Sequence, residues 1–166
     1  TFKTAVDSLK TLTDELRADF NLLHTNFVNG AFTAAGLAEG TNAATIKTAA
    51  TLNYAIAGQL YTKAATDNIA ITATAQQAIS TFCLYLVSIN SAGTVVVTKG
   101  TALGTDTAVL PARPGDSALV GAFKIATDGA TTYTGGTTDN GAAGITDTYY
   151  DLAFCNSGAD AATVIA

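Results

Sequence analysis

The chain has 166 residues and is dominated by small uncharged ones, with 33 Ala, 29 Thr and 15 Gly against only 13% charged residues. A net charge of −5 with only eight Lys and Arg argues against nucleic-acid binding, which needs a basic surface to replace phosphate counterions. No apolar run approaches the roughly 20 residues that a membrane helix requires, so we expect no membrane among the partners.

Residues 2–28 are predicted to form a helix with one narrow apolar face. Apolar residues recur alternately four and three positions apart, at the a and d positions that coiled coils bury between chains. We call this row the seam, and only Thr13 interrupts it: Phe2, Val6, Leu9, Leu16, Phe20, Leu23 and Phe27. Because so narrow a face is too small for an ordinary core-facing helix, we predict that these seven residues drive oligomerisation.

The charges of this segment alternate in sign at spacings of three or four and are predicted to pair along the helix: Lys3, Asp7, Lys10, Asp14 and Arg17. Asp19 at heptad position g lies within reach of His24, at position e, from a parallel neighbour. The alternative is a helix that lies on the β domain of its own chain. Bulky Phe at position a disfavours two strands, so we expect a homotrimer.

The chain divides into three parts by composition. Residues 1–29 form the helical unit, which the Asn29-Gly30 pair is predicted to end. Residues 30–51 are a low-complexity stretch rich in Ala, Thr and Gly, which we interpret as a linker or an extended arm. Residues 52–166 have the texture of a β domain.

Short strands separated by turn signals are predicted throughout this third part. Residues 54–63 read as a hairpin, and Thr81 to Ile89 is apolar on both faces, which is typical of a central strand. The Asn90-Ser91-Ala92-Gly93 loop leads to a partner strand over 94–99. Further strands are expected at 69–72, 118–126, 131–134 and 145–154. The fold class is therefore mainly β, an antiparallel sandwich or jelly-roll-like domain with an N-terminal helix.

The sequence contains few residues in patterns that are typical of catalysis. The single histidine, His24, lies on the predicted helix, and no GxSxG motif surrounds any serine. The glycines within 135–144 are not followed by the Lys of a phosphate-binding loop. We therefore predict no enzyme and no cofactor, with cleavage of polysaccharide by Asp139 or Asp147 as a weak alternative.

Metal and disulfide chemistry are also weakly indicated. The acidic residues after Asp128 offer oxygen ligands for calcium, but EF-hand spacing is absent, which favours a solvated acidic rim and no metal. Cys83 lies in an apolar stretch and is interpreted as a buried free thiol, with a bridge to Cys155 as the alternative. Tyr149 and Tyr150 either offer a stacking surface for glycan or place one ring in the core and one outside.

The order of strands and turns over residues 52–154 resembles the virion β domains of tailed bacteriophages. The segments that carry the resemblance are Thr81–Val87, Thr94–Gly100, Leu110-Pro111, Leu119–Ile125, Thr134–Asp139 and Gly144–Leu152. Proteins of that kind are capsid decoration proteins, head fibres, or pieces of tail fibres and baseplates, and many are trimers. It is a pattern of strands and turns rather than a catalytic signature.

The resemblance implies a structural role in a virion, on the outer surface of the capsid or on the tail. We expect a capsid decoration protein that binds the major capsid protein or other virion proteins and stabilises the shell through subunit contacts. The alternative is a tail-fibre or baseplate module that binds a host receptor or glycan.

Overall fold

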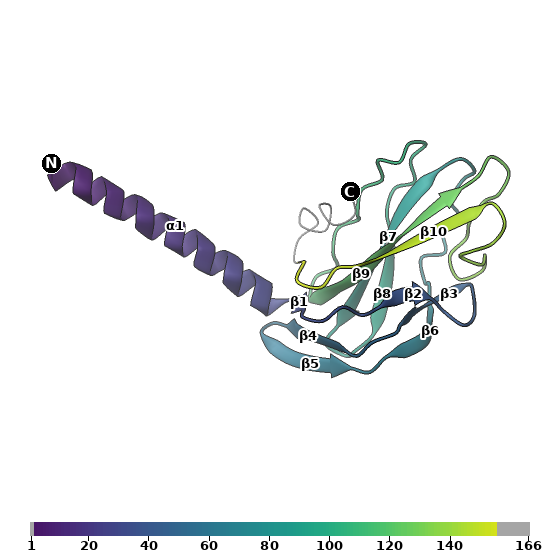
Figure 1. Ribbon diagram of the computed structural model, residues 1–166, viewed down its shortest axis with the longest axis horizontal. Coiled ribbons are helices and arrows are strands. Elements are labelled where there is room, and N and C mark those ends of the chain that lie inside the picture. Colours follow the sequence, from purple (N-terminus) through teal and green to yellow (C-terminus); the bar gives the residue numbers. More distant parts are fainter. Residues whose placement is uncertain (1, 156–166) are drawn as a thin grey trace.

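A computed structural model describes residues 2–155, with the backbone alone for residues 19–27. The described residues form one long helix, α1 (Phe2–Val28), followed by ten strands in three antiparallel sheets (Figure 1). The predicted mainly β class, an antiparallel sandwich with an N-terminal helix, is confirmed.

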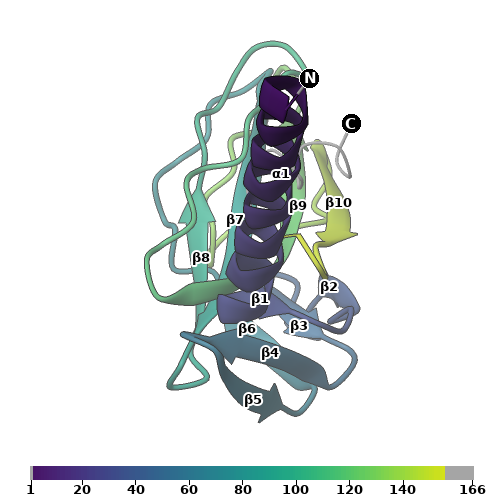
Figure 2. The same ribbon diagram turned by 90° about the vertical axis from the view of Figure 1, so that its left-hand side faces the viewer.

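Helix α1 projects away from the β domain over most of its length, and its last turn meets the domain beside β1 and β4 (Figures 1 and 2). The helix ends at Val28, immediately before the predicted Asn29-Gly30 stop. The tip of a hairpin meets this end, where the Gly58 amide donates to the Val28 carbonyl oxygen over 2.9 Å. The Ala57 amide donates to Oδ1 of Asn29 over 2.8 Å.

Two small sheets form one layer of the sandwich. The first has the order β1-β4-β5, with bounds Gly30–Ala31, Leu52–Ile56 and Gln59–Lys63. The second has the order β2-β3-β6, with bounds Leu37–Glu39, Thr45–Thr48 and Thr66–Ala70. The predicted 54–63 hairpin is confirmed as β4 and β5, and Ala57 and Gly58 form its turn with positive φ at both residues.

The four-stranded sheet forms the other layer, with the order β10-β9-β7-β8. Its strands are β7 (Phe82–Asn90), β8 (Val95–Lys99), β9 (Ser117–Thr127) and β10 (Ile145–Asp151). The hairpin predicted at Asn90–Gly93 is confirmed, because Oδ1 of Asn90 accepts from the amides of Ala92 and Thr94, each over 3.0 Å. Gly93 takes a φ of 75° there.

The main core lies between the four-stranded sheet and the two small sheets. Tyr85 of β7 stacks on Phe123 of β9 with ring centroids 4.8 Å apart, and both are fully buried. Ile46 and Tyr54 enter the same core from the small sheets. Packing of side chains from all three sheets into one cluster makes residues 30–155 a single folded unit.

The far face of β7 and β9 is also covered. Leu86 and Leu119 form a second buried cluster there with Leu152 and Cys155, and Leu110 from the segment before β9 packs on it. This cover explains why the β7 sequence is apolar on both faces, and the prediction of a central strand is confirmed.

The interpretation of residues 30–51 as a linker or arm is wrong. The stretch contributes β1, β2 and β3, which pair with later strands, and it buries Ala31, Ala35, Leu37 and Ile46. Strands of two to four residues built from Ala, Thr and Gly are too short and too small to give a clear alternating pattern.

Three finer expectations also need correction. Residues 131–134 form no strand, and only Tyr133 makes an isolated bridge, to Gln77. The strand expected at 69–72 begins and ends earlier in the sequence, at Thr66–Ala70. The alternative of a Cys83–Cys155 bridge is wrong, since the two cysteines form no disulfide and belong to clusters on opposite faces of the four-stranded sheet.

Candidate assembly surface on the N-terminal helix

The described seam side chains point into solvent. Phe2 is 88% exposed, Leu9 is 65% exposed and Leu16 is 68% exposed, and Val6 is also exposed. Every described side chain from Phe2 to Ala18 is exposed. The alternative of a helix lying on its own β domain is therefore wrong for this part of the helix, and its seam is left available to another molecule.

The second half of the seam is placed by the backbone only. Side chains of Phe20, Leu23 and Phe27 lie outside the described residues, as does that of His24. The helix runs without interruption to Val28, so the heptad spacing of the first half carries through these positions. The role of all seven seam residues in oligomerisation stays a prediction.

Leu12 is a surface residue that the a and d pattern missed. It occupies heptad position g, beside the seam, and is 61% exposed. Together with Leu9 and Leu16 it widens the apolar face in the middle of the described half. Inspection of the flanking e and g positions, and not of a and d alone, is the signal that reveals it.

Thr13 interrupts the seam without leaving an unpaired polar group. Its hydroxyl donates to the Leu9 carbonyl oxygen over 2.8 Å, one turn earlier in the same helix. A buried hydroxyl is costly only where it lacks a partner. Thr13 can therefore enter a contact between helices with its hydroxyl already paired.

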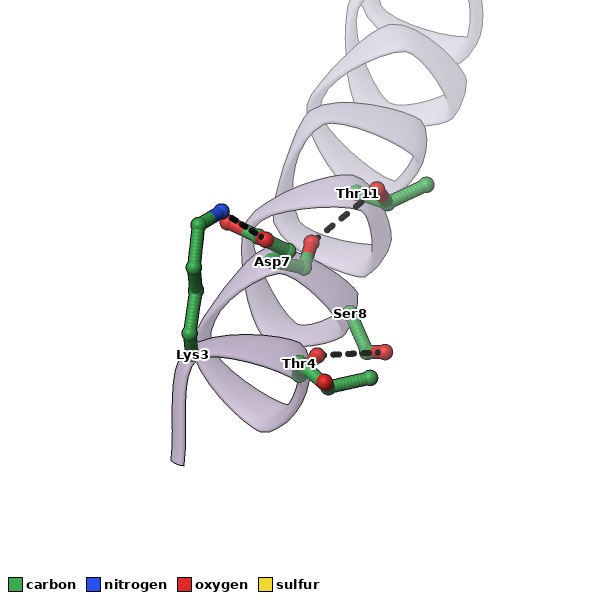
Figure 3. Close-up of polar contacts among 5 residues, drawn as sticks. All are labelled: Lys3, Thr4, Asp7, Ser8 and Thr11. Carbon is green, nitrogen blue, oxygen red and sulfur yellow. Dashed lines mark hydrogen bonds and ion pairs between the residues drawn. The ribbon is translucent and has the colours of Figure 1, made fainter. Parts of the chain in front are cut away.

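Polar side chains of the helix also find partners within the helix. Lys3 pairs with Asp7 over 2.7 Å, and the Ser8 hydroxyl donates to the Thr4 carbonyl oxygen (Figure 3). Lys10 and Asp14 pair over 3.8 Å, so two of the predicted intrahelical pairs are confirmed. Exposed pairs of this kind contribute about 0.3–0.5 kcal/mol each and support the helix without covering its seam.

Asp128, the first of the acidic residues in the last part of the chain, holds a turn. Oδ1 of Asp128 accepts from the amides of Ala130 and Thr131, and these hydrogen bonds hold the pKa of the Asp128 carboxyl below its usual value. Asp67 is held in the same way by Thr41, which lowers its pKa. Among the described side chains of residues 2–155, no three His, Cys, Asp or Glu residues gather as metal ligands would.

The Tyr149-Tyr150 pair does not form one platform. The Tyr149 ring packs toward the core, 5.8 Å from Phe123 between centroids, and its burial raises the pKa of its hydroxyl. Tyr150 follows it on β10 and so faces the opposite side of the sheet, where it interacts with Lys124.

In the described part of the chain, no helix has the length and apolar character needed to cross a membrane. Comparisons with protein-family models, with curated proteins and with solved structures gave no match.

Proposed function

We propose that this chain is a structural protein that assembles through α1 and presents its β domain as a rigid head. The observation that carries the proposal is the exposed seam on a helix that projects from the domain (Figure 1). In its specific form, the protein is a capsid decoration protein of a tailed bacteriophage, a homotrimer bound to the major capsid protein on the outer shell, without enzymatic activity or cofactor.

The energetics favour a partner for the helix. At 1.5 Å per residue the 27 residues of α1 span about 40 Å. Burying one large apolar side chain contributes about 1.5–3 kcal/mol, and exposed apolar side chains occupy every position of the described seam except Thr13. In proteins most of the stability of a helix comes from packing of its apolar face, so contact with other copies supplies what the β domain does not.

The β domain suits a role in repeated contacts. Both faces of its central strands are already covered, and the two described core clusters contain no residue of α1. With few charged residues and many small ones, neighbouring subunits can approach closely at low desolvation cost. Together with the resemblance to phage virion domains, this favours a shell component whose individual contacts are weak and whose number is large.

A second candidate is a tail-fibre or baseplate module that binds a host receptor or glycan. The observation that favours it is Val109, 71% exposed on the long segment between β8 and β9. A glycan array separates the candidates, because a decoration protein should bind none of the glycans.

The assembly step is tested by light scattering on the size-exclusion eluate of the full chain. Leu9→Asp with Leu16→Asp places charge on the seam and is expected to convert trimers to monomers. Ser8→Asp with Thr11→Asp adds the same charge outside the seam and should leave the trimer intact. A monomeric wild type, or a seam variant that keeps the oligomer, would contradict the proposal.

The virion role is tested by quantitative mass spectrometry of purified source particles against the major shell protein. A copy number comparable to that of the shell protein supports capsid decoration. A small fraction of it favours the fibre or tail alternative, and absence from the particle overturns both.

A further inference from the structure

The two flanks of the seam differ in charge. Heptad position e carries a basic residue in every heptad of the described half: Lys3, Lys10 and Arg17, all exposed. Position g is occupied by Ala5, by the exposed Leu12 and, in the next heptad, by Asp19. In coiled coils these flanking positions set which orientation neighbouring helices adopt.

In an antiparallel pair of helices, each flank of one helix faces the same flank of the other. If Leu9 is layered with Phe20 of the neighbour, position e faces position e, so Lys10 lies opposite Arg17 of the other copy, and this happens twice per helix pair. Position g then faces position g, and Leu12 meets Asp19. Like charges across the contact and a carboxylate on an apolar side chain both destabilise this arrangement.

A parallel arrangement resolves both conflicts. Position g of one helix then faces position e of the next heptad on its neighbour, which sets Leu12 beside Arg17. The aliphatic stem of Arg17 can cover Leu12 while its guanidinium reaches water. Lys10 then faces Ala5 instead of another cation.

The register follows from the seam itself. In register, Thr13 layers with Thr13 of the neighbours, and its hydroxyl is already paired with the Leu9 carbonyl oxygen. A shift by one heptad would leave Phe2 and Val6 without a layer, exposing two large apolar side chains on each shifted chain.

We propose that the α1 helices of neighbouring copies associate in parallel and in register, with the basic e flank of each against the Leu12 flank of the next. The inference rests on the proposed assembly through the seam. This arrangement gives the oligomer two different ends, with all Phe2 ends together at one and all β domains together at the Val28 end. Such an oligomer attaches by one end and presents its heads at the other.

Disulfide trapping of the full chain tests the orientation. Phe2 is the first seam residue and is 88% exposed, so Phe2→Cys removes one seam side chain at the helix start and keeps the other six. In the parallel arrangement the new thiols are adjacent, whereas in the antiparallel one they lie about 40 Å apart. Oxidised glutathione serves as oxidant, and the wild-type chain, whose Cys83 and Cys155 are buried, is the control that should form no linked dimer.

The outcomes separate the orientation from the assembly. We expect the reduced Phe2→Cys protein to be oligomeric and oxidation to link pairs of chains. An equimolar mixture with Phe27→Cys, unfolded and refolded together, should give no disulfide between a Phe2→Cys chain and a Phe27→Cys chain. An oligomer that links only in that mixture would overturn the parallel arrangement and leave the assembly standing. A wild-type chain that is monomeric under the same conditions would overturn both.

Discussion

The amide of Gly58 donates a hydrogen bond to the carbonyl oxygen of Val28 over 2.9 Å, so the tip of the β4–β5 hairpin closes the last turn of α1. A helix end leaves carbonyl groups without partners, and here a residue 30 positions later satisfies one of them. Gly58 takes a φ of 77°, which favours glycine at this position. The helix is thus tied directly to the β domain.

A second hydrogen bond links the helix end to the hairpin, because Oδ1 of Asn29 accepts from the Ala57 amide over 2.8 Å. The variant Asn29→Ala removes this bond. The amide would lose its partner, and we expect unfolding to become easier by about 1 kcal/mol in a urea titration. Thr11→Ala is the control, since its exposed hydroxyl bonds within the helix. Equal midpoints for Asn29→Ala and wild type would show that this bond contributes no stability.

The strongest elements of the fold were predictable because their signals are local. Residues 82–90 are apolar on both faces, and the Asn90–Gly93 loop has the turn chemistry that its hairpin needs. The apolar seam of α1 was also visible in the sequence, and its narrowness favoured a helix that does not lie on its own domain. The pattern alone does not decide against the alternative, because the path of the chain after Val28 is not encoded by helical periodicity.

The part that could not be predicted depends on distant partners. Ala31, which pairs with Tyr54, and Ile46, which pairs with Ile69, are both fully buried in the main core. Neither pairing leaves a mark in the neighbouring residues, which are mostly Ala, Thr and Gly. The a and d pattern does not include Leu12 for a different reason, since its position beside the seam matters only once the seam is known to be exposed.

Gly121→Ala is expected to destabilise the sandwich. A Cβ at this position of β9 would lie 2.6 Å from the Tyr150 carbonyl oxygen and 2.9 Å from Cδ2 of Leu37, so the sheets must separate locally. Overpacking of this kind costs about 1–3 kcal/mol. Gly115→Ala is the matched control, because its Cβ would have open space and should leave the urea midpoint near that of wild type. Similar midpoints for both variants would contradict the close approach at Gly121.

Asn140→Ala should also destabilise the domain. The buried Tyr133 hydroxyl donates to Oδ1 of Asn140 over 2.6 Å, and Nδ2 of Asn140 donates to the Thr45 carbonyl oxygen over 2.9 Å. An unpaired buried hydroxyl costs about 1–3 kcal/mol, measured as a lower free energy of unfolding. The neighbouring exposed residue provides the control variant Asp139→Ala. Because the Thr45 bond ties the glycine-rich loop to the 30–51 stretch, an unchanged free energy would argue that this stretch is not anchored there.

Alkaline pH should weaken the core. Burial raises the pKa of the Tyr85 and Tyr133 hydroxyls above the ordinary value of 10.0. A group whose pKa is raised by folding contributes its full stability below the unfolded pKa and loses it as pH rises, so the free energy of unfolding should fall above about pH 10. Urea titrations from about pH 8 to 11 measure this slope, which should be shallower in Tyr85→Phe. A stability independent of pH over that range would contradict the burial of these hydroxyls.

Helix content should depend on protein concentration. With its described side chains from Phe2 to Ala18 in solvent, α1 gains little packing from its own β domain, and packing of the apolar face supplies most of the stability of helices in proteins. Dilution should therefore lower the circular dichroism signal at 222 nm as oligomers dissociate, while the signal of the β domain persists. The Leu9→Asp with Leu16→Asp variant should start at the diluted value and show no concentration dependence. A wild-type helix signal that stays constant on dilution to monomers would mean that α1 is stable alone, and that its seam is not needed to hold it folded.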